Sequence, residues 1–194
     1  MRNTSKQSSN LLKLIIVALL GTISLLLFFL NFPLPFLPPY LKIDFSDVPA
    51  LMASLIFSPL AGIIVVAVKN LLYLAVSGAG DPIGVAANFL AGVMFVVPVS
   101  ILYHKYKGVK SIVSGLVTGT LIMAIGMSVL NYFIILPAYG WFMGWEMTNQ
   151  VIWASVLAGV LPFNIIKGII VALLFVPLFI KMHSWITQQQ TKFI

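Results

Sequence analysis

The sequence Pro162-Phe163-Asn164-Ile165-Ile166-Lys167-Gly168 lies inside an apolar run from about residue 151 to residue 180. A run of this length is more than enough to cross a bilayer as one helix. Asn164 and Lys167 are three residues apart, so they share one face of that helix at membrane depth. A lysine at the centre of a spanning helix costs roughly 3 kcal/mol or more, and such residues rarely face lipid. The stretch therefore predicts a helical membrane protein with a polar interior.

Two interpretations of this buried lysine are open. Lys167 could pair with helix carbonyls or a neighbouring polar side chain purely for packing. Alternatively, Lys167 and Asn164 could point into a cavity and hold a polar ligand. Ionisable residues inside membrane spans usually mark functional sites, which favours the second interpretation.

The composition excludes an ordinary soluble domain. The 194 residues are 61% hydrophobic and 8% charged, with a mean hydropathy of +1.11, whereas a globular chain carries roughly a quarter charged residues. There are no cysteines, so disulfides and thiolate metal sites cannot form. The net charge of +7 comes largely from basic residues at span ends, so it predicts membrane topology and not a nucleic-acid patch. We predict no metal site.

The hydrophobic pattern predicts an all-α membrane protein with six transmembrane helices. These are expected at about 11–30, 48–57, 62–76, 85–103, 111–136 and 151–180 within one membrane domain, residues 11–182, flanked by cytoplasmic tails at 1–10 and 183–194. The first run is too long for a signal-peptide core, and no small-x-small cleavage pattern follows it. The second helix is too short for a full crossing, so we expect it to lie beside protein or to extend slightly.

The charges predict the orientation. Basic residues concentrate at the N-terminus, in the loop at 103–110 and at the C-terminus, so both termini are expected in the cytoplasm. All four acids, Asp44, Asp47, Asp81 and Glu146, then fall on the outer side. The expected location is a bacterial plasma membrane crossed several times.

The outer connections carry turn signals. Residues 31–40 contain four prolines among Phe, Leu and Tyr, which disfavours a helix and predicts an apolar lid over the outer mouth of the bundle. Residues 41–45 alternate apolar and polar side chains, as a short extended piece does. Asp47 suits a helix N-cap. Turns are expected at 77–84 and over the loop at 137–150, where Trp141 and Trp145 are typical of a membrane interface.

Small residues mark two helix faces for close packing. Ala18, Gly21 and Thr22 share a sector of the first helix, and the fifth helix carries Ser111, Gly115 and Gly119 at four-residue spacing. A second lysine at depth, Lys69, is expected to pair with a carbonyl or to extend along its stem toward the interface, with ligand contact as the alternative.

The predicted topology brings the buried polar residues to one place. Asn88, Asn131, Asn164 and Lys167 fall in the outer or middle parts of three helices, beneath a roof formed by Phe36, Leu37, Tyr40 and Leu41. Apolar walls with a few fixed polar groups are typical of a small-molecule pocket. Asparagine offers both a donor and an acceptor, and lysine offers only donors. The expected ligand is flat, largely apolar and edged by an amide-like or imide-like group.

Several motifs are absent from the sequence. It contains no P-loop pattern, no HExxH, no GxSxG and no carboxylate inside a predicted span. We therefore predict no catalytic residue and no resident cofactor. A binder without an energy source of its own implies partner proteins.

Several stretches of this chain match a known family. They are Phe32 to Tyr40, Asp44 to Pro49, Lys69 to Leu72, Gly80 to Pro82, Asn88 to Gly92, Asn131-Tyr132 and Pro162 to Gly168. Through these stretches the chain, over about residues 11 to 182, resembles the riboflavin-specific substrate-binding (S) component of energy-coupling factor (ECF) transporters.

The resemblance implies a six-helix subunit that binds riboflavin from the outside. It also implies assembly with a transmembrane coupling subunit and two ATPases, which supply ATP hydrolysis. In that family polar groups matching Asn131, Asn164 and Lys167 hold the flavin ring and the first loop gates the site; Tyr40, Leu41 and Asn88 are added here as site residues. Docking on the coupling subunit is implied through Ala18, Gly21 and Thr22, where the family often has Ala-x-x-x-Ala.

Two alternatives to a riboflavin carrier are considered. The same fold could serve a different vitamin or small planar metabolite. A membrane-embedded enzyme or a structural subunit would belong to another class, and the enzyme would need a reactive pair at membrane depth that the sequence does not supply.

Overall fold

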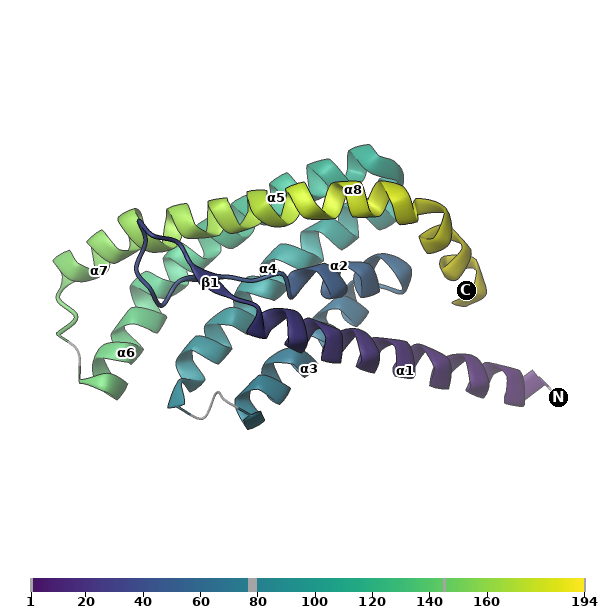
Figure 1. Ribbon diagram of the computed structural model, residues 1–194, viewed down its shortest axis with the longest axis horizontal. Helices are drawn as coiled ribbons and strands as arrows, with labels where there is room; N and C mark the ends of the chain where they lie inside the picture. The colour runs from purple at the N-terminus through teal and green to yellow at the C-terminus, as the bar shows by residue number, and fades with distance from the viewer. Residues whose placement is uncertain (1, 77–79, 145, 194) are drawn as a thin grey trace.

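The computed structural model describes residues 2–76, 80–144 and 146–193, which are almost entirely helical (Figure 1). A two-residue antiparallel ladder joins β1 (Phe32–Pro33) and β2 (Lys42–Ile43), with Phe32 opposite Ile43. The helices are α1 (Arg2–Phe29), α2 (Asp47–Ile56), α3 (Pro59–Val76), α4 (Pro82–Tyr106), α5 (Gly108–Leu130), α6 (Leu136–Met143), α7 (Asn149–Ser155) and α8 (Leu161–Phe193), with π-helical turns η2 (Asn131–Ile135) and η3 (Val156–Val160).

Among the described residues, five helical segments are long and apolar enough to cross a membrane. They are Asn10–Phe29, Pro59–Val76, Pro82–Tyr106, Gly108–Met143 and Asn149–Lys192. The fourth joins α5, η2 and α6, and the fifth joins α7, η3 and α8. With the short α2 they make six helical segments over the described residues, so the predicted all-α membrane class is confirmed. Both ends of the chain lie at the same end of the bundle (Figure 1); their cytoplasmic location stays a prediction.

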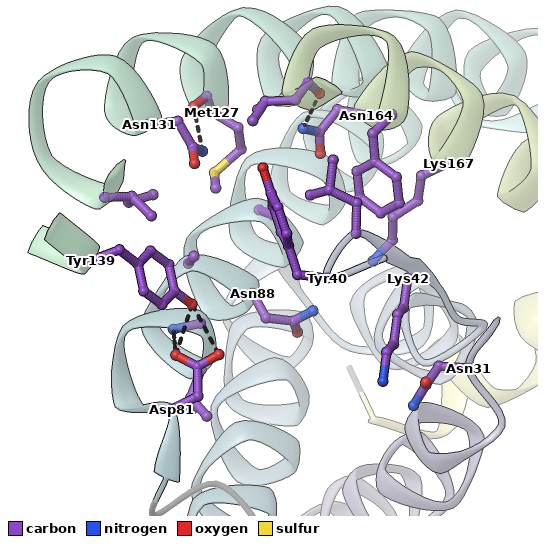
Figure 2. Close-up of a pocket in the computed structure, with 18 of the residues that line it drawn as sticks. Asn31, Tyr40, Lys42, Asp81, Asn88, Met127, Asn131, Tyr139, Asn164 and Lys167 are labelled. Atoms are coloured by element: carbon purple, nitrogen blue, oxygen red, sulfur yellow. Dashed lines mark hydrogen bonds between the residues drawn. The ribbon is translucent and has the colours of Figure 1, made fainter. Parts of the chain in front are cut away.

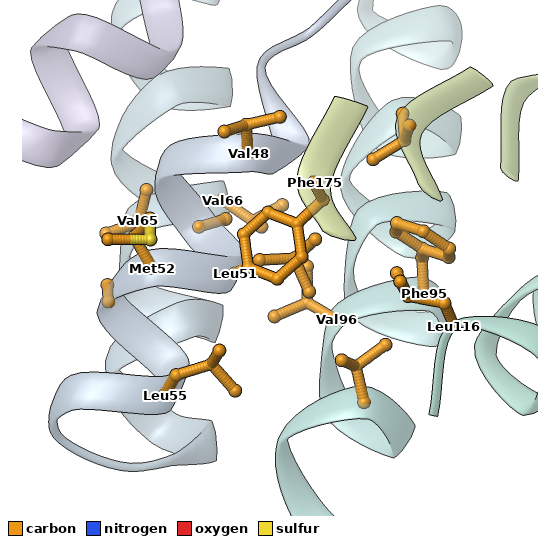
Figure 3. Close-up of a cluster of buried hydrophobic side chains, with 14 of the residues drawn as sticks. Val48, Leu51, Met52, Leu55, Val65, Val66, Phe95, Val96, Leu116 and Phe175 are labelled. Atoms are coloured by element: carbon orange, nitrogen blue, oxygen red, sulfur yellow. The ribbon is translucent and has the colours of Figure 1, made fainter. Parts of the chain in front are cut away.

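The short helix α2 forms the centre of the bundle. All ten of its residues are buried, so it needs no lipid-facing surface. Leu51 and Leu55 of α2 pack with Phe95 of α4, Leu116 of α5 and Phe175 of α8 in one apolar cluster (Figure 3).

The last carbonyls of α2 are satisfied by polar side chains from other helices. The Ser54 carbonyl accepts from Ser100 Oγ at 3.0 Å and lies 2.8 Å from His104 Nε2. The Leu55 carbonyl accepts from Gln190 Nε2. A helix that ends inside a membrane protein needs such partners because water cannot reach its carbonyls.

One predicted loop differs in the structure. The loop predicted from residue 137 begins later, because α6 continues through Pro137 to Met143. Proline is compatible with the first turn of a helix, and here it follows the π-helical turn η2. The last helix extends past its predicted end to Phe193, with Ile186 fully buried, and the cytoplasmic location of this tail stays a prediction. Ser77–Ala79 of the predicted turn and Trp145 lie outside the described residues.

Helices α4 and α5 pack through glycine, as the four-residue spacing predicts. A Cβ added to Gly119 would lie 2.6 Å from the Phe95 carbonyl oxygen, and one added to Gly115 would lie 2.9 Å from Val99 Cα. Both obstacles are backbone atoms of α4, which cannot move aside without separating the helices. This close approach fixes the spacing of the helices that carry Asn88 and Asn131.

Gly119→Ala is expected to lower the thermal unfolding midpoint in detergent, because overpacking of a rigid contact costs about 1–3 kcal/mol. Gly126→Ala is the matched control. Its added Cβ would meet only the flexible end of Met94, so a much smaller change is expected. Equal midpoints for the two variants would contradict the backbone contact at Gly119.

Candidate ligand-binding site

A cavity of about 350 Å³ lies among α4, the α5–η2–α6 rod, α8 and the segment between α1 and α2. We call this segment, residues 30–46, the lid. All six residues predicted from the sequence line the cavity: Tyr40, Leu41, Asn88, Asn131, Asn164 and Lys167. Their shared location is therefore confirmed, and their binding role stays a prediction. Phe36 and Leu37 were expected in the roof, but they are not among the lining residues; Lys42 is.

Asn131 and Asn164 present their amide oxygens to the cavity. Each donates its Nδ2 group to the carbonyl four residues earlier, Met127 and Val160 respectively, at 2.8 Å. Asn131 opens the π-helical turn η2, and Val160 ends η3. One of the two N–H groups of each amide is engaged within the helix, which fixes the amide so that its oxygen is available as a hydrogen-bond acceptor. Figure 2 shows the Asn131 and Asn164 amides on either side of the Tyr40 side chain, each with its oxygen directed away from the carbonyl that its Nδ2 group contacts.

The lid contributes an aromatic side chain to the cavity. The Tyr40 ring projects between Asn131 and Asn164 (Figure 2) and is 52% exposed. Burial raises the pKa of its hydroxyl above the ordinary value, so it stays protonated at neutral pH. The lid also touches the wall near η3, where Pro38 and Leu41 are the nearest side chains to Gly159.

Lys167 is both a wall residue of the cavity and an ion-pair partner of the lid. Its Nζ lies 3.0 Å from Asp44 Oδ2 and 3.2 Å from Asp47 Oδ2, and its side chain is only 5% exposed. The Asp44 carboxylate accepts a hydrogen bond from the ammonium group, and the Asp47 carboxylate lies within ion-pair distance of it. An ammonium group has three N–H donors, so a donor remains on a residue that lines the cavity. Lys167 therefore pairs with neighbouring polar side chains, as the first interpretation expected. It also lines the cavity, and ligand contact stays a prediction.

Asp47 does not cap α2 through its side chain, so that prediction was wrong. Ser46 occupies the N-cap position without a side-chain cap bond, and Asp47 is the first residue of the helix. Its carboxylate pairs with Lys167 instead. The attraction of a buried ammonium at close range outweighs a single bond to a helix N–H.

Lys69 pairs with polar side chains, one of them through an amide carbonyl oxygen, and it does not extend to the interface. Its Nζ donates to Ser46 Oγ at 3.0 Å and to Asn88 Oδ1 at 2.6 Å. It is 1% exposed and is not among the residues that line the cavity. Lys69, Lys167, Asp44 and Asp47 form what we call the charge cluster.

The charge cluster is balanced, with two ammonium groups and two carboxylates. Burial raises the pKa of the Asp44 carboxyl, but the ammonium groups of Lys167 and Lys69 and the Ser46 hydroxyl lower it further, so the pKa lies below its usual range. Asp44 is therefore ionised at neutral pH. These pairs were not predicted, because all four acids were expected on the outer side, whereas Asp44 and Asp47 are buried beside Lys167.

Asp81 and Tyr139 close another side of the cavity. The Tyr139 hydroxyl donates to both Asp81 oxygens, at 2.7 and 2.9 Å, and the Gly84 N–H donates to Oδ1 at 2.8 Å. Asp81 thus caps α4 and joins it to α6. Sequence reasoning did not identify Tyr139, since it fell in a segment expected to be loop.

Of the three small residues predicted for docking, one is buried in the bundle and two are exposed. A Cβ on Gly21 would lie 2.6 Å from Val68 Cγ1, so Gly21 packs against α3 inside the bundle. Ala18 and Thr22 are exposed, and Thr22 Oγ1 donates to the Ala18 carbonyl. Only Ala18 and Thr22 remain available to a partner.

Comparison with known proteins assigns this chain to a family. Residues 12–179 match the model of the substrate-specific component of ECF transporters. The chain therefore belongs to that family, a class of membrane-embedded substrate-binding subunits.

Individual relatives agree with this assignment. The chain is 48% identical to the riboflavin transporter FmnP of Bacillus subtilis over 185 residues, covering 94% of this chain and 97% of the relative. It is 43% identical to the riboflavin transporter RibU of Staphylococcus aureus, covering 90% and 92%. A solved structure described as the S component of a bacterial ECF transporter aligns with a TM-score of 0.76 at 44% identity, covering 89% of this chain and 96% of that one.

Asp44→Asn is expected to lower the thermal unfolding midpoint strongly, because breaking a buried ion pair costs about 3–5 kcal/mol. Glu146→Gln removes the same charge from an exposed acid and should leave the midpoint nearly unchanged. The measurement is thermal unfolding in detergent, monitored by tryptophan fluorescence. If Asp44→Asn melted at the wild-type temperature, the charge cluster would not stabilise the fold.

Proposed function

We propose that this chain is a riboflavin-binding S component that delivers riboflavin across the bacterial plasma membrane with an ECF module. The observation that carries this proposal is the cavity, where two inward asparagine oxygens and one lysine ammonium meet beneath an aromatic lid. Two relatives that are more than 40% identical over nearly their whole length bear the name riboflavin transporter.

The chemistry of riboflavin complements this cavity. One edge of its flat ring system carries a carbonyl, an N–H and a second carbonyl, and the opposite edge is apolar. The Asn131 and Asn164 oxygens suit the ring N–H, and the remaining Lys167 donor suits a ring carbonyl. Tyr40 supplies a face for stacking. A volume of about 350 Å³ lies within the range of pockets that enclose small molecules.

Energy for transport comes from partners in this proposal. A transmembrane coupling subunit and two ATPase subunits supply ATP hydrolysis, because this sequence lacks a phosphate-binding loop. The exposed pair Ala18 and Thr22 on α1 is the proposed docking surface. Riboflavin is the transported substrate and not a cofactor.

The purified chain should therefore be yellow. Riboflavin absorbs visible light, so a protein that retains it through detergent purification will show a flavin spectrum. Added riboflavin should also quench the tryptophan fluorescence of the ligand-free protein in a saturable way. A colourless protein whose fluorescence does not respond to riboflavin, but which binds another vitamin saturably, would support an S component for a different planar metabolite.

Lys167→Ala should weaken riboflavin binding at least tenfold, because a hydrogen bond from a charged group contributes about 1.5–3 kcal/mol. Lys181→Ala removes an exposed lysine from the same helix and should bind like the wild type. Binding is measured by fluorescence titration on the monodisperse fraction, since Lys167→Ala also leaves buried carboxylates without their partner. Unchanged affinity in a folded Lys167→Ala protein would remove this side chain from the binding site.

A further inference from the structure

We propose that Lys69, which does not touch the cavity, is a positioning residue that fixes both the lid and the Asn88 amide for ligand binding. This inference rests on the proposed function, because the site it organises is the riboflavin cavity. It also predicts a change in the lid that can be measured without any ligand.

The surroundings of Lys69 are specific for an ammonium group. The residue is 1% exposed, and its Nζ lies 4.8 Å from the centroid of the Phe28 ring, a cation–π contact. Its other contacts are Ser46 Oγ and Asn88 Oδ1. Phe28 and Asn88 both line the cavity, and Ser46 ends the lid. Every one of these contacts therefore leads to the cavity or to the lid.

The first contact of Lys69, with Ser46, connects it to the lid. Because lysine can only donate, Ser46 Oγ accepts from Lys69 and gives its own proton to Asp44 Oδ1. The Ser46 N–H donates to the same oxygen at 2.9 Å, and Asp44 Oδ2 accepts from Lys167 at 3.0 Å. A continuous series of hydrogen bonds thus joins α3 through the end of the lid to the cavity wall on α8.

The second contact of Lys69, with Asn88, sets the orientation of the Asn88 amide. Since Lys69 has no acceptor, the Asn88 oxygen must face it, and the Nδ2 group is left for the cavity. Asn131 and Asn164 have the opposite arrangement, with Nδ2 engaged and the oxygen free. The cavity consequently offers donors from Asn88 and Lys167 and acceptors from the other two asparagines. This pattern selects a ligand that carries both carbonyl and N–H or hydroxyl groups.

Lys69 also keeps the charge cluster neutral. Its ammonium interacts electrostatically with the Asp47 and Asp44 carboxylates. Both Asp47 oxygens lack a hydrogen-bond donor among the described residues, although Lys167 lies within ion-pair distance of one of them. Removal of Lys69 would leave two carboxylates facing one ammonium in a region closed to water, and the resulting repulsion acts on the segment that holds the lid.

The test is Lys69→Met, which keeps the length of the side chain and removes its charge. Riboflavin dissociation should become at least tenfold faster, while every lining side chain is retained. Lys13→Met is the matched control, since Lys13 is a partly buried lysine over the Phe57 ring and away from the cavity. It should dissociate at the wild-type rate. Wild-type dissociation from a folded Lys69→Met protein would overturn the proposal.

A second variant separates positioning from folding. Lys69→Met combined with Asp47→Asn restores neutrality but leaves the Asn88 amide unanchored, so it should fold better than Lys69→Met. It should release riboflavin more slowly than Lys69→Met but at least threefold faster than wild type. This variant carries the test if Lys69→Met does not fold. A double variant that dissociates like the wild type would show that Lys69 does not position the site.

The lid can be followed without riboflavin. The chain has no cysteine, so Phe36→Cys, at a lid residue that is 71% exposed, gives one site for a spin label. Lys69→Met should make this label more mobile, and Lys13→Met should not. If the wild type does not bind riboflavin, the proposed function fails but the lid effect of Lys69 is still measured. Unchanged label mobility in Lys69→Met would overturn the positioning role by itself.

Discussion

The requirement to neutralise charge in a water-poor interior shapes the outer half of this protein. Two lysines on separate membrane helices would be costly alone. They are tolerated because the lid and the start of α2 bring Asp44 and Asp47 into the bundle, where Lys167 lies 3.0 and 3.2 Å from them. The lid is therefore attached at its end by charge, and its residues that line the cavity are Asn31, Tyr40, Leu41 and Lys42.

Two of the polar groups in the cavity are oriented by hydrogen bonds within their own helices. Asn131 and Asn164 each satisfy one carbonyl of their own helix and present an oxygen inward. Asn131 begins the π-helical turn η2 and precedes Pro137. Asn164 follows the π-helical turn η3 and Pro162. A π-helical turn displaces the residues after it relative to a regular helix and is frequent at functional sites. The two rods thus present comparable acceptors from different helices to one ligand.

A short central helix makes this arrangement possible. Because α2 is buried along its whole length, it can end inside the protein, with its carbonyls satisfied by Ser100, His104 and Gln190. Its first residue is Asp47, so the position of α2 places that carboxylate beside Lys167. The apolar cluster that contains Leu51 and Phe175 holds α2 in place, and Asp47 of the charge cluster is the first residue of this helix. Packing at the centre therefore determines the geometry at the ligand site.

Sequence patterns alone established the membrane class and most of the helical segments, because hydropathy and the cost of polar groups in lipid are local properties of each span. Together with the family resemblance they also indicated six of the residues that line the cavity. They did not determine which groups pair. Asp44 and Lys167 are 123 residues apart, and only the path of the lid brings them together. The inward position of Gly21, the continuation of α6 through Pro137 and the orientation of the Asn88 amide were likewise decided by tertiary structure. Each depends on a neighbouring helix or turn whose position no local pattern specifies.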